Sequence, residues 1–129
     1  MQKKLLVLAS RNAFPKQMAI DLVNAGHAIE FAYSGDEALE RLQCSLGRRR
    51  GVPDAMIVTE EAVAEAGHET NSVKLLGRQA HLIVGYPIPV IAMFPWVNGI
   101  NEHGQVTVMP GNPDLLGEVL LNVFSENPS

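Results

Sequence analysis

The side chains that could carry metal chemistry are few and scattered along this sequence. The four histidines are His27, His68, His81 and His103, and none has a second histidine or a cysteine three or four positions away. Metal sites built from such residues usually depend on that spacing on a helix face or in a loop. The sequence therefore predicts no metal site and no cofactor.

A hydrolytic site is the next kind of chemistry to test. Ser10, Thr59 and the histidines supply hydroxyl and imidazole groups, but the Gly-x-Ser-x-Gly turn that presents a nucleophilic serine is missing. A glycine-rich loop that would hold a phosphate or a dinucleotide after the first apolar run is also missing, and Gly111 and Asn112 are the only weak candidates. We expect a protein that is not an enzyme.

Composition limits the classes of partner and compartment. The chain has 129 residues, 47% of them hydrophobic, and a formal net charge of −4. We expect one domain over residues 1–125 and a C-terminal tail or the start of a linker at 126–129. The acidic balance argues against direct nucleic-acid binding, and no apolar run approaches the roughly 20 residues of a membrane-spanning helix. We expect a soluble, cytoplasmic protein, and the single cysteine, Cys44, fits a reducing compartment without proving it.

Hydrophobic patterns predict the elements that would position any site. Continuous or alternating apolar runs predict five strands, at residues 4–9, 27–32, 55–59, 88–94 and 106–109. Four helices are expected between and after them: from Pro15 to a stop at Gly26, from the cap at 34–36, over 72–82, and from Pro113 onward. Their apolar faces are expected to contain Met18, Leu22 and Val23; Ala38, Leu39, Leu42 and Leu46; Val73, Leu75, Leu76 and Ala80; and Leu115, Leu116, Val119, Leu120 and Val123. Residues 60–67 are expected to form a loop or one loose turn.

This alternation of strands and helices favours a parallel sheet with helices on both faces. Five stretches then resemble the response-regulator receiver family in order and spacing: Lys4 to Ala9, Ser34-Gly35-Asp36-Glu37-Ala38-Leu39, Pro53 to Val58, Ile88-Pro89-Val90-Ile91, and Met109-Pro110. The resemblance implies a flavodoxin-like, doubly wound sheet of five parallel strands in the order 2-1-3-4-5. Only about fifteen turn-rich residues separate Phe94 from Met109, so the family's fourth helix is expected to be short or missing.

The resemblance also locates a phosphorylation pocket, and this chain departs from it at every position. Receivers hold magnesium with two acidic residues after the first strand, accept a phosphoryl group on an aspartate after the third, and use a hydroxyl and a lysine after the fourth and fifth. The matching positions here are Ala9, Ser10, Thr59, Phe94 and Met109. We expect no phosphoryl transfer, and Asp21, Asp36 and Asp54 fall too far away to replace the missing acids. A one-residue shift would put Glu60 at the acceptor position as a permanent charge, and this alternative stays open beside that of a solvated loop acid.

Two surfaces are candidates for partner binding. Trp96 and Phe94, with Tyr86 and Pro87, form either an aromatic interface or packing that fills the altered pocket. Arg48, Arg49 and Arg50, with Arg41, form either a docking patch for an acidic partner or a solvated basic loop.

We therefore expect a pseudo-receiver, which is a signalling or regulatory module of a bacterial two-component-type system that acts by protein–protein interaction without phosphorylation. Its partner would be another signalling protein, another domain of the same chain or a second copy. The alternative is a small-molecule-binding domain that uses the crevice at the carboxyl ends of the strands, lined by Ala9, Ser10, Thr59, Phe94 and Met109.

Overall fold

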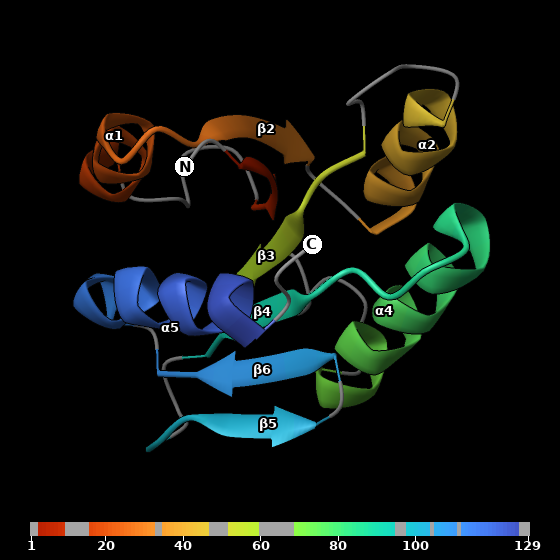
Figure 1. Cartoon of the computed structure of the whole chain (residues 1–129). Helices are drawn as coiled ribbons and strands as arrows, with labels where there is room; N and C mark the ends of the chain where they lie inside the picture. The colour runs from red at the N-terminus through yellow and green to blue at the C-terminus, as the bar shows by residue number, and fades with distance from the viewer. Residues whose placement is uncertain are drawn as a thin grey trace.

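The computed structural model shows an α/β fold in which helices cover both faces of one sheet (Figure 1). It describes residues 3–9, 16–32, 35–46, 52–59, 69–94, 98–103, 105–110 and 112–126. The strands are β1 (Lys4–Leu8), β2 (Ala28–Ala32), β3 (Ala55–Thr59), β4 (Val90–Met93), β5 (Asn101–His103) and β6 (Val106–Met109). The helices are α1 (Lys16–Asn24), α2 (Gly35–Ser45), α4 (Glu69–Val84) and α5 (Pro113–Glu126). Within these described segments, no helix has the length and apolar character needed to cross a membrane.

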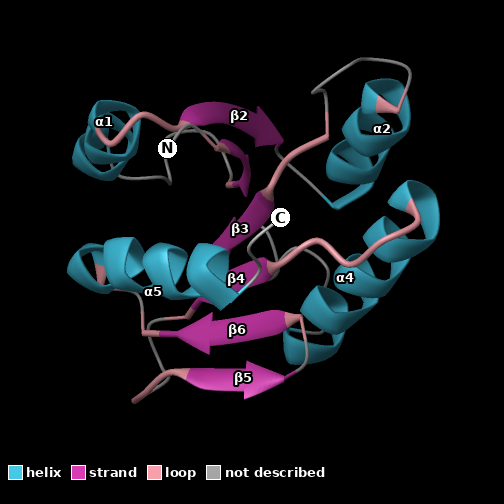
Figure 2. Ribbon diagram, viewed as in Figure 1, coloured by secondary structure: helices cyan, strands magenta, loops and turns pink. Residues whose placement is uncertain are grey.

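The sheet has six strands in the order β2-β1-β3-β4-β6-β5, so the predicted five-stranded sheet is wrong at one edge (Figure 2). All neighbouring pairs are parallel except β5 and β6, which are antiparallel and place Glu102 opposite Thr107. Residues 98–103 contain no helix, in agreement with the expected loss of the fourth helix. The short segment before β6 pairs back on it as a hairpin, because two antiparallel strands need far fewer connecting residues than a helical crossover.

The strands separate two apolar layers. Leu6, Met56 and Val90 face α2 and α4, whereas the alternating residues Leu5, Ile57 and Ile91 face α1 and α5. This burial on both faces explains why β1, β3 and β4 are almost continuously apolar in sequence. The predicted boundaries of these strands agree with the structure to within two residues.

The end of α1 follows the expected glycine signal. Gly26 has a φ of 97°, a left-handed conformation that glycine adopts without a Cβ penalty. The Gly26 amide donates to the carbonyl of Val23 at 3.0 Å, and the His27 amide donates to that of Leu22 at 3.1 Å. These two bonds make a Schellman motif, which ends the helix and turns the chain directly into β2.

Among the described side chains, three that were assigned to buried helix faces are instead exposed: Val23, Leu46 and Leu75. The side chain of Val73 lies outside the described part. Val23 and Leu75 each adjoin a buried residue, Leu22 and Leu76 respectively, and successive helical positions differ by about 100°, so the rotation that buries Leu22 or Leu76 turns its neighbour outward. Leu46 lies just beyond the end of α2.

Gly77 lies in the middle of α4, where glycine normally weakens a helix. The Gln105 side-chain amide donates to the Gly77 carbonyl at 2.9 Å and to the Ile88 carbonyl at 3.3 Å. A Cβ at position 77 would come within 2.8 Å of that amide nitrogen. The absence of a side chain therefore lets Gln105 connect α4 to the segment entering β4.

Candidate functional site

The carboxyl ends of the parallel strands bring the predicted pocket residues to one edge of the sheet. Thr59 pairs in register with Met93, and Met93 with Met109. Phe94 follows β4, and its amide donates to the Met109 carbonyl at 3.0 Å. Ala9 follows β1, and its amide donates to the Ala32 carbonyl of β2 at 3.0 Å. The expected juxtaposition of Ala9, Thr59, Phe94 and Met109 is therefore present, whereas Ser10 and Glu60 lie outside the described residues.

Three of these four side chains are buried. Ala9 is 2% exposed, Phe94 1% and Met109 0%. Ala9 and Met109 belong to the apolar layer under α1 and α5, and Phe94 belongs to the layer under α2 and α4. Where the receiver pattern needs ionised or hydroxyl groups, the described edge of the sheet is packed with hydrocarbon and a thioether.

Among the four described pocket residues, Thr59 has the polar side chain, and its hydroxyl already has a hydrogen-bond partner. Its Oγ1 donates to the Leu8 carbonyl at 3.0 Å, a bond that joins the ends of β3 and β1. The hydroxyl thus satisfies a backbone carbonyl in a half-buried position, which is a structural role.

The three aspartates that the sequence assigned to other elements lie on α1, on α2 and before β3. Asp21 is exposed on α1, and Asp36 lies in the first turn of α2. Asp54 precedes β3 at the opposite, amino-terminal edge of the sheet, where its Oδ2 accepts a bond from the Lys4 amide at 2.8 Å. Among the residues that the structure describes, no group of three histidine, cysteine or acidic side chains is arranged to hold a metal ion.

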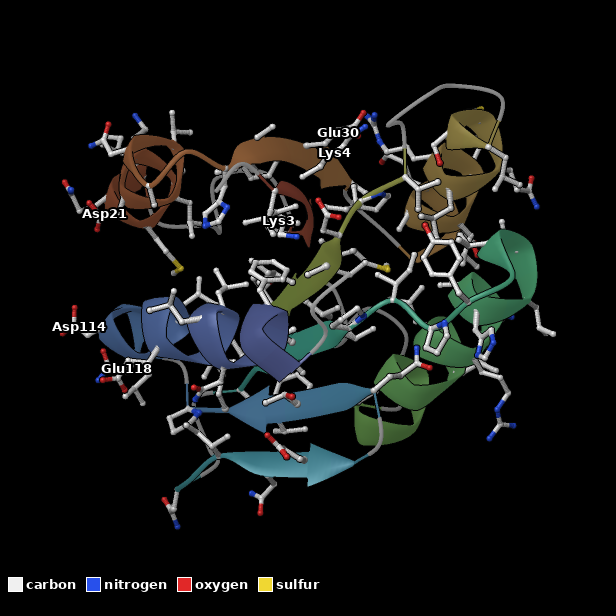
Figure 3. The ribbon with its side chains drawn as sticks, in the orientation of Figure 1. Lys3, Lys4, Asp21, Glu30, Asp114 and Glu118 are labelled. Carbon is white, nitrogen blue, oxygen red and sulfur yellow. The ribbon has the colours of Figure 1, made fainter. Side chains whose placement is uncertain are left out.

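A second polar cluster lies against β1, β2 and α2 and surrounds a pocket of about 310 Å³. The Glu30 carboxylate contacts Lys4 Nζ at 3.3 Å and Arg41 Nη1 at 3.2 Å, and Figure 3 shows Lys4 and Glu30 side by side. Arg41 Nη2 contacts Glu37 at 3.1 Å. The pocket is lined by Lys4, Glu30, Glu37, Glu40, Arg41, Cys44 and Ser45.

The sequence left Arg41 open between a docking patch and a solvated basic surface, and the structure pairs it within the protein, with Glu30 and Glu37. The four-residue spacing of Glu37 and Arg41 on a helix was a signal for their ion pair. The pairing with Glu30 depends on α2 lying over β2 and has no sequence signal. This network joins two strands to a helix, and its groups are roughly one-third to two-fifths exposed.

We predict a modest, salt-sensitive contribution from this network. Glu30→Gln is expected to lower the free energy of unfolding by about 1 kcal/mol or less, because partly exposed ion pairs are screened by solvent. Urea unfolding at low salt and at about 1 M NaCl should show the loss shrinking at high salt. Glu40→Gln is the matched control, since Glu40 lines the same pocket and is exposed; a salt-sensitive loss of equal size there would contradict the assignment.

His27 lies where α1 turns into β2 and packs against Phe124 of α5, with ring centroids 6.0 Å apart. Its Nδ1 is buried without a hydrogen-bond partner among the described residues. Burial lowers the pKa of His27 below its ordinary value of 6.5, Lys3 adds to the lowering, and Asp54 opposes it. The folded protein therefore favours the neutral ring.

This lowered pKa predicts a loss of stability in mild acid. Below about pH 6.5 the unfolded chain binds more protons at His27 than the folded chain does, so stability falls as the pH falls through that range. Urea unfolding between about pH 5.5 and pH 7.5 should show a shallower pH dependence for His27→Gln than for the wild type. The same substitution at the exposed His81 is the control, and an unchanged slope for His27→Gln would contradict the prediction.

The candidate partner surfaces are only partly described. Tyr86 follows α4 and is 51% exposed. Phe94 is buried, so of the two alternatives it fits packing rather than an exposed aromatic interface. Trp96 and the arginines Arg48, Arg49 and Arg50 lie outside the described residues. Asn112, a weak candidate for phosphate binding, caps α5, because its Oδ1 accepts a bond from the Asp114 amide at 3.0 Å.

No family model and no curated protein matches this chain. One similar solved structure is the yeast Spc42 trimeric coiled coil, amino acids 181–211, fused to another structure. The two share 16% sequence identity at a TM-score of 0.62, over 98% of this chain and 79% of that chain. At this identity the similarity shows the fold alone.

Proposed function

We propose that this chain is a pseudo-receiver, a flavodoxin-like signalling module that acts by protein–protein contact and has no phosphoryl chemistry of its own. In this proposal it belongs to a bacterial two-component-type system. It would relay or regulate a signal through another signalling protein, another domain or a second copy.

The apolar edge of the sheet is the observation that supports this proposal. Transfer of a phosphoryl group to a carboxylate needs a bound dication and a cation to balance the new charge. Ala9, Phe94 and Met109 offer neither, and their burial leaves them no access to a phosphodonor. The Thr59 hydroxyl is held by the Leu8 carbonyl, and an alcohol does not replace the carboxylate in this transfer.

The small-molecule alternative receives less support from the same edge. A ligand crevice needs exposed walls with a few polar groups to orient the ligand. Three of the four described residues expected to line it are at most 2% exposed, and the polar group of the fourth is already bonded. A pocket of about 310 Å³ lies away from this edge, against β1, β2 and α2.

Incubation with acetyl phosphate and Mg²⁺, followed by intact mass spectrometry, tests the proposal. The expected result is an unmodified mass, while a receiver with a complete acidic pocket gains a phosphoryl group in the same reaction. A phosphoryl group that is added to the wild type but not to Thr59→Val would contradict the proposal. Loss of the label in Glu60→Gln instead would assign the acceptor to Glu60, and would contradict it equally.

A further inference from the structure

The outer face of α4 carries two leucines that do not pack into the core. Leu75 is 51% exposed and Leu82 is 79% exposed, and their seven-residue spacing puts them on one side of the helix. Arg78 lies between them and is exposed, and it forms no ion pair with any residue that the structure describes. We call Leu75, Arg78 and Leu82 the α4 face, and it combines apolar surface with a positive charge.

The outer face of α5 has the opposite charge. Asp114, Glu118 and Leu121 follow one another at spacings of four and three residues, so they lie on one side of that helix. Leu121 is 70% exposed. Figure 3 shows Asp114 and Glu118 on the side of the molecule that also carries Asp21 of α1. We call Asp114, Glu118 and Leu121 the α5 face, and it combines apolar surface with negative charge.

We propose that the α4 face of one copy binds the α5 face of a second copy, head to tail. This deepens the proposed function, on which it rests, by naming one partner as the chain itself and the surfaces as α4 and α5. Contact would cover exposed leucines and bring Arg78 of one copy to Glu118 of the next, so apolar burial and charge complementarity favour the same arrangement.

The spacing of the residues fits this contact. Arg78 lies three residues after Leu75, and Glu118 lies three residues before Leu121. When the two helices pack antiparallel, Leu75 against Leu121 places Arg78 level with Glu118, because both helices rise about 1.5 Å per residue. The same register places Leu82 level with Asp114, so Leu82 would lie at the rim of the contact. Two α4 faces packed on each other would instead place Arg78 near its own counterpart, and residues 75–84 contain no acid to offset that repulsion.

The two faces belong to opposite sides of the sheet, since α4 lies with α2 and α5 lies with α1 (Figure 1). One copy can therefore bind two others, one at each face, and the contact adds further copies unless a rotation closes a ring. Three leucines and one ion pair make a small interface, so we expect a dissociation constant on the order of 0.1 mM.

Variants that change only one of the two faces test the arrangement. Their association is measured by sedimentation over about a hundredfold range of concentration around the expected dissociation constant. The mean mass of the wild type should rise with concentration. Arg78→Glu and Glu118→Lys should each weaken association by about tenfold or more. An equimolar mixture of the two should recover association and growth, because the intact α4 face of Glu118→Lys meets the intact α5 face of Arg78→Glu, and the reversed charges on the other two faces also attract each other.

Matched controls separate this contact from a general effect of charge. Lys16→Glu and Glu102→Lys make the same changes in net charge at exposed positions outside both faces, and should associate as the wild type does. A wild type that stays monomeric to about 1 mM, an association that Arg78→Glu and Glu118→Lys leave unchanged, or a mixture that fails to associate would each overturn the head-to-tail contact. Such a result leaves the unmodified mass expected with acetyl phosphate unchanged, so the two proposals fail separately.

Discussion

Truncating Phe94 to alanine is expected to lower the free energy of unfolding by about 3–5 kcal/mol, a large part of the roughly 5–15 kcal/mol available to a domain of this size. Phe94 is 1% exposed and packs with the apolar layer under α2 and α4. Removing its ring takes away buried apolar surface and leaves a cavity that the surrounding sheet can close only in part. Urea unfolding with fitted midpoints and slopes measures the loss.

Tyr86→Ala is the control for this loss. Tyr86 is also aromatic and lies before the same strand, but it is half exposed, so we expect a cost below about 0.5 kcal/mol. Similar small losses at both positions would mean that Phe94 does not contribute to apolar packing at this edge of the sheet. The proposal of a pseudo-receiver, which depends on that packing, would then lose its support.

Introducing a lysine at the end of β6 is expected to destabilise the protein still more. Met109 is fully buried in the layer under α1 and α5, and the described residues that adjoin it in register, Met93 and Phe94, carry no acid. Met109→Lys would bury an ammonium group without a counter-charge from these neighbours, at a cost of about 4 kcal/mol or more. Thermal and urea unfolding should show a partly unfolded variant.

The isosteric variant Met109→Leu separates charge from shape. A swap between these two apolar side chains of similar volume usually costs less than about 1.5 kcal/mol. Near-wild-type stability of Met109→Lys would indicate that its ammonium group reaches solvent or a carboxylate, and it would contradict the expectation that a charge at position 109 is buried among apolar described residues.

Much of the fold could be predicted from the sequence, because the buried strands are continuous apolar runs and the helix stop at Gly26 has a clear local signal. Ala9, Thr59, Phe94 and Met109 were also predicted to lie close together, because they stand at the carboxyl ends of parallel strands, which share one edge of the sheet. The α/β class follows from alternating elements alone, whatever family the chain belongs to.

The remaining features depend on contacts between distant segments. β5 is three polar residues long, and only its pairing with β6 makes it a strand. The exposure of Leu75 beside buried Leu76 depends on how α4 is rotated against the sheet, which two adjacent leucines do not specify. The contact of Arg41 with Glu30 spans eleven residues and two elements, so no short-range spacing predicts it.

Amide NMR spectra with and without Mg²⁺ and beryllofluoride, a mimic of the phosphorylated acceptor, test the central claim most directly. A pseudo-receiver predicts unchanged resonances for Ala9, Thr59, Phe94 and Met109, because the described edge offers the ion no carboxylate and the fluoride complex no acceptor. Shifts that cluster at these residues and saturate with Mg²⁺ would show a working acceptor at this edge and would contradict the claim.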